Sequence, residues 1–358
     1  MVNQKNVPNF RPHTQNKSTF MKTLLKGGKW PYYKVILACL LTGAFSFAIS
    51  HQFHKTPPTP TANPPAGKQL VLTRLKDYKF IQPLLLSDMT DPDPGMNGLM
   101  TEIESTISSY HQKDTAYRAS VYIRDLNDAR WNVLNQEEKY DPGSILKLPI
   151  MIALMKKAES DPGILEQQIL YQGTERKLPT QTIKPTSIQP GTVYKVKDLL
   201  QFMIVESDNE ANMLLFNFLK PEVVLKVFRD LNMEVPDVSQ PTVYMKAADV
   251  SKFLRIIYNS SYTNPRLSEY AMELLEKTKF KDGMKKSIPG DALLVHKFGE
   301  RGYPGTSYQE LCETGIIYLN DQRVLLTIMT KGNNQRDQAA SISEITRKVV
   351  NRMQSSNL

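Results

Sequence analysis

Segments with strand patterning form two groups in this chain, separated by a long stretch whose patterning is mostly helical. The first group covers residues 119–124 and 130–134, with a turn at Asn127-Asp128 between them. Residues 164–285 follow and are read mostly as helices and loops. The second group has three members, the last two forming a predicted hairpin: residues 292–297, 314–319 and 324–329.

Amphipathic helices are predicted at both ends of this pattern. Apolar residues at helical spacing precede the first strands (Leu99, Ile103, Ile107 and Tyr110), and a closing helix covers residues 337–353. The order helix, two strands, helical insertion, three strands, helix is typical of an α+β domain. We therefore predict that residues 97–358 form a five-stranded antiparallel sheet flanked by terminal helices, with an inserted all-helical lobe.

The N-terminal part predicts a membrane anchor. Residues 1–34 are basic and contain no acid, which indicates a cytoplasmic tail. Residues 35–53 include a charge-free apolar run of 16 residues and predict a transmembrane signal-anchor. The alternative is a signal peptide cleaved near Ala48 or Ser50. With the N-terminus inside, the anchor would place the rest of the chain outside the cell membrane, in a periplasmic or extracellular position.

Two segments separate this anchor from the predicted domain. Residues 54–68 contain five prolines and no large apolar residue after Lys55, so they predict an extended linker. Residues 69–96 form an extension whose role the sequence does not reveal; Tyr78 to Leu86 in it are compatible with a short extended segment packed on the domain.

The formal net charge of +9 does not indicate a nucleic-acid partner once the charges are located. Of the 45 basic residues, seven lie in residues 1–34, which hold none of the 36 acidic residues. The remaining 38 basic residues nearly balance the acids. The five histidines show no paired metal-ligand spacing, so neither a metal nor a cofactor is expected. We expect the catalytic domain to be monomeric.

The stretch from Tyr140 to Met155 begins with the turn signal Asp141-Pro142-Gly143 and continues as an apolar helix. Ser144 and Lys147 lie three residues apart in its first turn, so their side chains share one face. A lysine there loses hydration, its pKa falls, and its neutral amine can take the serine proton. Ser144 is the only serine in the chain followed by lysine at this spacing. The alternative is a helix-capping serine beside a solvated lysine.

Two further groups of polar residues follow in order. Ser207-Asp208-Asn209 lies between two apolar helices, 63 residues after Ser144, where helix capping is the alternative explanation. Lys297-Phe298-Gly299 ends a predicted apolar strand, 90 residues beyond Ser207, where a solvated strand end is the alternative. Each group is a weak signal by itself.

Taken in this order, the three groups resemble the Ser-x-x-Lys, Ser-Asp-Asn and Lys-x-Gly motifs of the penicillin-recognising serine enzymes, the class A β-lactamases and penicillin-binding D,D-peptidases. Further segments also look like class A β-lactamase sequences: residues 207–216, 221–232, 315–324 and 329–332. The resemblance covers about residues 97–353. It implies the β-lactamase/transpeptidase-like fold, which has the α+β plan predicted above.

The resemblance also implies roles for individual residues. Ser144 would attack an amide carbonyl and form an acyl-enzyme, with Lys147 as the base. Ser207 and Lys297 would relay a proton to the leaving nitrogen, and Lys297 would supply positive charge for a substrate carboxylate. Asn209 would bind a substrate carbonyl. The oxyanion hole would consist of the backbone N–H groups of Ser144 and of Glu300, the residue after Gly299.

The sequence departs from the family pattern in two places. Phe298 stands where the family has Thr or Ser, whose hydroxyl binds the substrate carboxylate, so this task would fall to Lys297 and Arg301. The Glu-x-x-Leu-Asn pattern, whose glutamate activates the deacylating water in class A β-lactamases, is missing between Asn232 and Lys246. Glu234 is the only glutamate in that segment, and its context does not match. Acylation is therefore expected, whereas fast deacylation is not.

The predicted function is a membrane-anchored, extracytoplasmic serine hydrolase of the class A β-lactamase type, acting on a β-lactam substrate. One alternative is a D,D-carboxypeptidase or transpeptidase-like penicillin-binding protein acting on D-alanyl peptides. A second alternative, motivated by Phe298, is a catalytically impaired binding or sensor module.

Overall fold

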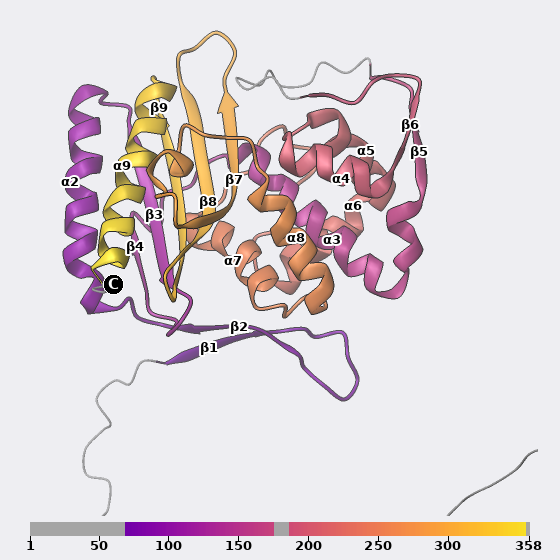
Figure 1. The fold of residues 1–358 in the computed structure, drawn as a ribbon, viewed down its shortest axis with the longest axis horizontal. Helices are drawn as coiled ribbons and strands as arrows, with labels where there is room; N and C mark the ends of the chain where they lie inside the picture. The colour runs from indigo at the N-terminus through magenta and orange to yellow at the C-terminus, as the bar shows by residue number, and fades with distance from the viewer. Residues whose placement is uncertain (1–68, 175–185, 356–358) are drawn as a thin grey trace, which may run out of the picture. The chain divides into compact units, whose positions relative to one another are not determined.

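The computed structural model describes residues 69–174 and 186–355 (Figure 1). The predicted tail (1–34), anchor (35–53) and linker (54–68) lie outside the described residues. In the part that is described, no helix is both long enough and apolar enough to span a membrane.

A five-stranded antiparallel sheet forms the centre of the domain, with the strand order β4-β3-β9-β8-β7. Both predicted strand groups therefore join one sheet, in which β9 pairs with β3 from the first group and with β8 from the second. The fold class and the strand count are confirmed. The strands are β3 (Arg118–Asp125), β4 (Trp131–Leu134), β7 (Leu293–Gly302), β8 (Gln309–Leu319) and β9 (Gln322–Gly332).

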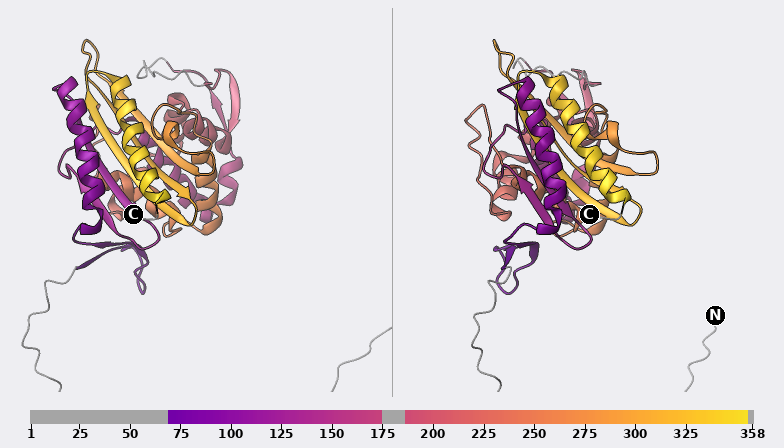
Figure 2. Two further views of the ribbon diagram at one scale, coloured as in Figure 1. Left: turned by 60° about the vertical axis from the view of Figure 1, so that its left-hand side comes forward. Right: turned by 90° about the vertical axis from the view of Figure 1, so that its left-hand side faces the viewer.

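Two helices cover one face of the sheet and the helical lobe covers the other (Figures 1 and 2). Helices α2 (Asn97–Lys113) and α9 (Gln335–Gln354), from the two ends of the domain, lie side by side on the first face. The lobe consists of α3 (Lys147–Ser160), α4 (Val196–Val205), α5 (Asn209–Leu219), α6 (Pro221–Asp230), α7 (Ala247–Tyr258) and α8 (Pro265–Glu276).

Strand alternation divides the apolar residues between two cores. In β3, Val121 and Ile123 pack with α2 and α9, whereas Tyr122 packs with the lobe. In β9, Leu326 packs with α2 and α9, whereas Leu325 packs with the lobe. Because both faces are buried, the central strands read as nearly continuous apolar runs, which is why they are recognisable in the sequence.

The structure corrects two details of the sequence prediction. The helical insertion is not entirely helical, because β5 (Gln168–Tyr171) and β6 (Thr192–Lys195) form a separate two-stranded sheet. Each strand has only four residues, and their pairing joins segments about 20 residues apart, so local patterning does not reveal it. In addition, β7 does not end at Lys297; it continues, paired with β8, to Gly302.

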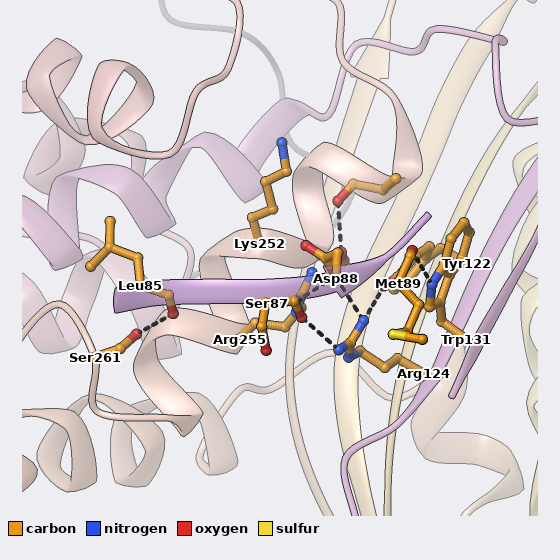
Figure 3. Close-up of polar contacts among 12 residues, drawn as sticks. Leu85, Ser87, Asp88, Met89, Tyr122, Arg124, Trp131, Lys252, Arg255 and Ser261 are labelled. Atoms are coloured by element: carbon orange, nitrogen blue, oxygen red, sulfur yellow. Dashed lines mark hydrogen bonds and ion pairs between the residues drawn. The ribbon is translucent and has the colours of Figure 1, made fainter. Parts of the chain in front are cut away.

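The extension at residues 69–96 forms a β-hairpin of β1 (Leu70–Arg74) and β2 (Leu84–Met89), followed by a short 3₁₀ helix. The edge of β2 that is not paired with β1 is held by side chains of the domain (Figure 3). The carbonyl oxygens of Leu85, Ser87 and Met89 accept hydrogen bonds from Ser261 Oγ (2.8 Å), Arg124 Nη2 (3.0 Å) and Trp131 Nε1 (3.0 Å), respectively.

Asp88 of the same strand lies between two arginines (Figure 3). Its Oδ1 is 2.8 Å from Arg124 Nη1, on β3, and 2.7 Å from Arg255 Nη2, on α7. Leu85 and Leu86 are buried in the lobe core. The extension is therefore part of the folded domain, and the packed extended segment considered for Tyr78 to Leu86 corresponds to the start of β2.

Candidate active site

Ser144 lies in a 3₁₀ turn (Gly143–Leu146) that leads directly into α3. The spacing of three residues places Lys147 Nζ 2.9 Å from Ser144 Oγ. The apolar residues of α3 bury this helix within the lobe, and the Lys147 side chain is buried with it, since the residue is only 2% exposed. The predicted meeting of hydroxyl and amine is thus present.

The segment between α4 and α5 brings its polar groups to the same amine. Lys147 Nζ lies 2.5 Å from the carbonyl oxygen of Ser207, 3.2 Å from Ser207 Oγ and 2.8 Å from Asn209 Oδ1. Asp208 is the helix cap, since its carboxylate accepts hydrogen bonds from the N–H groups of Glu210 and Ala211. Capping is therefore the role of the middle residue, and the two residues beside it contact the lysine.

The backbone of Ser207 is held in an unfavourable conformation. Its φ angle is +58°, in the left-handed region that non-glycine residues rarely adopt, and the residue is only 2% exposed. Such strain persists only where the surrounding structure enforces it, and it is common at functional sites. Here it accompanies the approach of both the carbonyl oxygen and the hydroxyl of Ser207 to Lys147.

Lys297 approaches Ser207 from the sheet. It is the fifth of the ten residues of β7, fully buried, with Nζ 3.0 Å from Ser207 Oγ and 3.1 Å from the carbonyl oxygen of Phe298. The expectation that it stands at a strand end is wrong, because β7 remains paired with β8 beyond it. Ser207 Oγ thus lies within hydrogen-bonding distance of two amines.

Burial changes the proton affinity of both amines. Desolvation lowers the pKa of Lys147 to about 7, against the opposing effect of the Asp208 and Glu300 carboxylates. Desolvation also lowers the pKa of Lys297 well below its usual value, and the charge of Lys147 adds to this. The Lys147 amine is therefore available as a base near neutral pH. A charged Lys297 would need an anion beside it, such as a substrate carboxylate.

Gly299 lets the β7 backbone approach the Ser144 turn. A Cβ atom at Gly299 would lie 2.0 Å from the carbonyl oxygen of Pro142 and 2.7 Å from the backbone nitrogen of Ser144. Gly143, with a φ angle of +53°, has equally little space, because a Cβ there would lie 2.8 Å from the backbone nitrogen of Glu300. The backbone at Glu300 therefore lies against the Ser144 turn, as the implied oxyanion hole requires.

The side chains of Glu300 and Arg301 have partners within the protein. The Glu300 carboxylate accepts a hydrogen bond from Gln335 Nε2 at 2.7 Å. Arg301 Nε lies 3.3 Å from Asp141 Oδ2, and Arg301 Nη2 donates to the carbonyl oxygen of Pro241 at 3.0 Å. The structure places Arg301 beside the turn before Ser144, where its Nε makes an ion pair with Asp141 without hydrogen-bond geometry and its Nη2 is hydrogen-bonded to Pro241.

Sequence reasoning did not identify Asp141 and Glu310 as part of this region. Both are buried, and burial raises the pKa of Asp141 and raises that of Glu310 to about 7. Asp141 carried one usable signal, since aspartate before Pro-Gly favours a turn in which its side chain accepts a backbone hydrogen bond. Glu310 carried none, because its contact with Asp141 joins residues 169 positions apart.

The two departures from the family pattern have defined positions in the fold. The Phe298 ring is 3% exposed and stacks on Phe280, with ring centroids 4.4 Å apart and an interplanar angle of 18°. Lys297 Nζ lies 4.4 Å from the centroid of the Phe298 ring. The Glu234 carboxylate is 78% exposed and pairs with Lys139 Nζ at 2.8 Å. Phe298 is thus a packing residue that covers the lysine, and Glu234 belongs to a surface ion pair.

The remaining titratable groups provide no metal site in the described chain. Within residues 69–174 and 186–355, no group of three or more His, Cys, Asp or Glu side chains is placed to hold a metal ion. His296 alternates with Lys297 along β7, so it faces the other side of the strand. There its Nδ1 lies 2.6 Å from Glu313 Oε1, and both residues are buried.

Comparison with known proteins gives one family and a set of structures. The sequence model of the β-lactamase enzyme family matches residues 99–353. Among the similar structures, that of PBP-A is 18% identical over 74% of this chain and 99% of its own, with a TM-score of 0.62. A variant of PBP-A, with a TM-score of 0.61, is described as an acyl-enzyme complex with penicillin G.

Two β-lactamase structures resemble this chain about as closely as the PBP-A structures do. The TLA-1 extended-spectrum β-lactamase is 16% identical over 72% of this chain and 99% of its own, with a TM-score of 0.63. A β-lactamase from Chitinophaga pinensis is 17% identical over 72% of this chain and 100% of its own, with a TM-score of 0.61. At these identities the likeness establishes the fold. No curated protein matches the sequence.

Proposed function

Because this chain belongs to the β-lactamase enzyme family, we propose that it is a serine hydrolase acylated at Ser144 by β-lactam-like amides, and that it hydrolyses the acyl-enzyme. The observation that carries the proposal is the convergence of four side chains from three distant segments. Ser144, Lys147, Ser207 and Lys297 form a continuous chain of contacts of 2.9, 3.2 and 3.0 Å. This connects a nucleophile to a base and to a proton relay.

Acylation begins at the Lys147 amine. In its neutral form the amine takes the proton of Ser144 Oγ as the oxygen attacks the substrate carbonyl carbon. The negative charge that develops on the carbonyl oxygen is stabilised by the backbone N–H groups of Ser144 and Glu300. Asn209 Oδ1 accepts a hydrogen bond from Lys147 Nζ and so positions the amine. The side-chain amide nitrogen of Asn209 is then available to donate to a substrate carbonyl.

Collapse of the tetrahedral intermediate breaks the amide C–N bond. The leaving nitrogen receives a proton from Ser207 Oγ, which is replenished through the two amines on either side of it. A water molecule then attacks the ester at Ser144, releases the acid product and returns the proton to the serine. Because the sequence between Asn232 and Lys246 does not contain the Glu-x-x-Leu-Asn pattern, we expect release of the acyl group to be the slow step.

A second function is favoured by the position of Glu234. Because this carboxylate is exposed and paired with Lys139, it does not serve as the base for a deacylating water in this structure. Slow hydrolysis suits a penicillin-binding D,D-peptidase, in which a D-alanyl peptide acylates Ser144 and a β-lactam forms a long-lived adduct. The two candidate functions share the acylation step and differ in the lifetime of the adduct.

Labelling with fluorescent penicillin, followed by intact-mass measurement, tests both functions. We expect a one-to-one adduct that is absent in Ser144→Ala. Ser251→Ala is the control for loss of a serine hydroxyl elsewhere in the domain, since Ser251 lies on α7, where its Oγ donates to the carbonyl oxygen of Ala248. An adduct lost within seconds supports a β-lactamase, and one that persists for hours supports a D,D-peptidase. A wild-type protein that neither forms an adduct nor consumes penicillin, or an adduct that survives Ser144→Ala, would falsify the enzymatic proposal.

We also propose that residues 35–53 anchor the enzyme in the cell membrane and that the catalytic domain lies outside the cytoplasm. The support comes from the sequence: an apolar run preceded by a basic, acid-free segment and followed by a proline-rich linker. Residues 54–68 would then keep the domain away from the bilayer. N-terminal sequencing of the mature protein from whole cells tests this, because a chain that starts near residue 51 excludes the anchor.

A further inference from the structure

The Asp141 side chain joins the two backbone segments that meet at Ser144. Asp141 Oδ1 accepts a hydrogen bond from the backbone nitrogen of Gly143 at 2.9 Å, within the Ser144 turn. Asp141 Oδ2 lies 3.3 Å from Nε of Arg301, the residue that follows Glu300 on β7. The residue is 4% exposed, so both contacts are sheltered from water. One carboxylate thus contacts both sides of the implied oxyanion hole.

Glu310 fixes the backbone of Asp141 from the neighbouring strand. Its Oε2 accepts a hydrogen bond from the backbone nitrogen of Asp141 at 2.5 Å, and its Oε1 accepts one from the Tyr303 hydroxyl at 3.1 Å. Glu310 on β8 is the cross-strand partner of Arg301 on β7, so the two side chains project from the same face of the sheet. The turn is therefore held by two adjacent strands.

The backbone contact itself offers no directional restraint. Gly143 and Gly299 allow the two segments to touch, but neither carries a side chain that could fix their relative position. An oxyanion hole needs its two donors within a few tenths of an ångström of the developing charge. Asp141 and Arg301 form a polar contact that spans the two segments, and Glu310 and Cys312, both on β8, contact the backbone of Asp141.

We propose that Asp141 is a positioning residue for the acylation of Ser144: with Arg301 and Glu310 it clamps the Ser144 turn to the Glu300 segment and so aligns the two oxyanion-binding N–H groups. The inference rests on the proposed function, because it assigns the clamp to the same acylation step. Asp141 does not touch the substrate; it acts through the backbone of residues 143–144 and 299–301.

Asp141→Asn tests the clamp with little change in size. The substitution removes the charge that pairs with Arg301, and the amide must turn one donor toward either the guanidinium or the Gly143 N–H. Because misplacement of a catalytic group by about 1 Å costs about a hundredfold in rate, we expect the acylation rate constant to fall about ten- to a hundredfold. The dissociation constant of the non-covalent penicillin complex should change less than about threefold, since uniform binding does not use the oxyanion contact.

Asp125→Asn is the matched control. Asp125 is the last residue of β3, where its Oδ1 accepts from the Asn127 backbone nitrogen at 2.8 Å and its Oδ2 lies 3.5 Å from Arg130 Nη2. It is 6% exposed, so it reproduces the burial and both contacts of Asp141. A general loss of stability would affect both variants alike, whereas loss of the clamp affects the acylation rate of Asp141→Asn alone.

Stopped-flow acylation with fluorescent penicillin separates the two constants, and amide hydrogen exchange measures the clamp without reference to activity. Asp141→Asn should raise exchange in residues 141–146 and also in residues 299–302. Unchanged acylation in Asp141→Asn, or an equal loss in Asp125→Asn, overturns the inference, as does faster exchange confined to residues 141–146. If the wild-type protein is not acylated, the proposed function fails, and the exchange result alone supports or overturns the clamp.

Discussion

At the base of the β1–β2 hairpin, Asp88 lies between the guanidinium groups of Arg124 and Arg255. In the candidate active site, the buried amines of Lys147 and Lys297 both contact the hydroxyl of Ser207. The arginines at the hairpin are 5% and 4% exposed at their side chains, close to the burial of Lys147 and Lys297. The two clusters differ in what faces the cations: a carboxylate at the hairpin, and hydroxyl, amide and carbonyl oxygens in the contacts of the lysines described above.

This difference separates a cluster that stabilises the fold, at Asp88, from a cluster suited to catalysis, at Ser144. A buried cation beside a carboxylate keeps its charge, and its pairing helps to hold the elements together. A buried amine whose closest partners are neutral oxygens favours the uncharged form, as the lowered pKa of Lys147 indicates. The fold thus buries cations for two purposes, and both the type of cation and the charge of its partner decide which, because a guanidinium stays charged when buried whereas a lysine amine can lose its proton.

The largest effect is expected from removing the amine at Ser144. Lys147→Met keeps the volume of the side chain but has no base, so the acylation rate constant should fall about a hundred- to ten-thousandfold. Lys156→Met is the control, because Lys156 lies on the same helix and pairs with Glu159. Stopped-flow labelling measures both variants. Rapid acylation of Lys147→Met would mean that the amine is structural, like the arginines at the hairpin.

The next largest effect should be a loss of stability without a loss of chemistry. Asp88→Ala leaves two buried guanidinium groups without their carboxylate; since Asp88 is 26% exposed, we expect a cost of about 3 kcal/mol in the free energy of unfolding. Asp249→Ala, which removes the carboxylate that pairs with Lys252 at 2.8 Å, should cost about 0.5 kcal/mol or less. Denaturant unfolding gives both values. A folded Asp88→Ala protein should still acylate at the wild-type rate, and a slower rate would show that the two clusters are coupled.

The effect of pH is small near pH 7 and grows as the pH falls. Because the pKa of Lys147 is lowered to about 7 and its neutral form is the base, acylation should be fastest above pH 7 and decrease about tenfold per unit below it. The apparent pKa belongs to Lys147 and Lys297 together, since they share Ser207 Oγ. Acylation rates measured between pH 5 and 9 test this, with thermal unfolding at each pH as the control. A profile that is flat across this range contradicts a titrating amine.

The sequence predicted the fold because each of its signals is local. Strand and helix periodicities, with both faces of the sheet buried, were sufficient for the five strands, the flanking helices and the inserted lobe. The weaker points were also local: β5 and β6 are too short to show a pattern, and the end of β7 contains two glycines and two charged residues that do not look like a strand. These segments become regular strands because they pair with neighbouring strands, although their composition does not indicate it.

The same division applies to the site. Ser144 and Lys147 are three residues apart on one helical turn, so their meeting follows from the sequence alone. The approach of Ser207 and Lys297 was implied only by family resemblance, since contacts over 60 and 90 residues depend on how the lobe packs against the sheet.

The functions of Asp88, Asp141 and Glu310 were decided by tertiary structure. Each carboxylate gains its role from partners on other elements, and no local pattern encodes such partners. Residue spacing along one element determines which groups can meet within it. Only the packing of elements determines whether a buried charge receives a counter-charge, and with it whether that charge holds the fold together or serves the chemistry at Ser144.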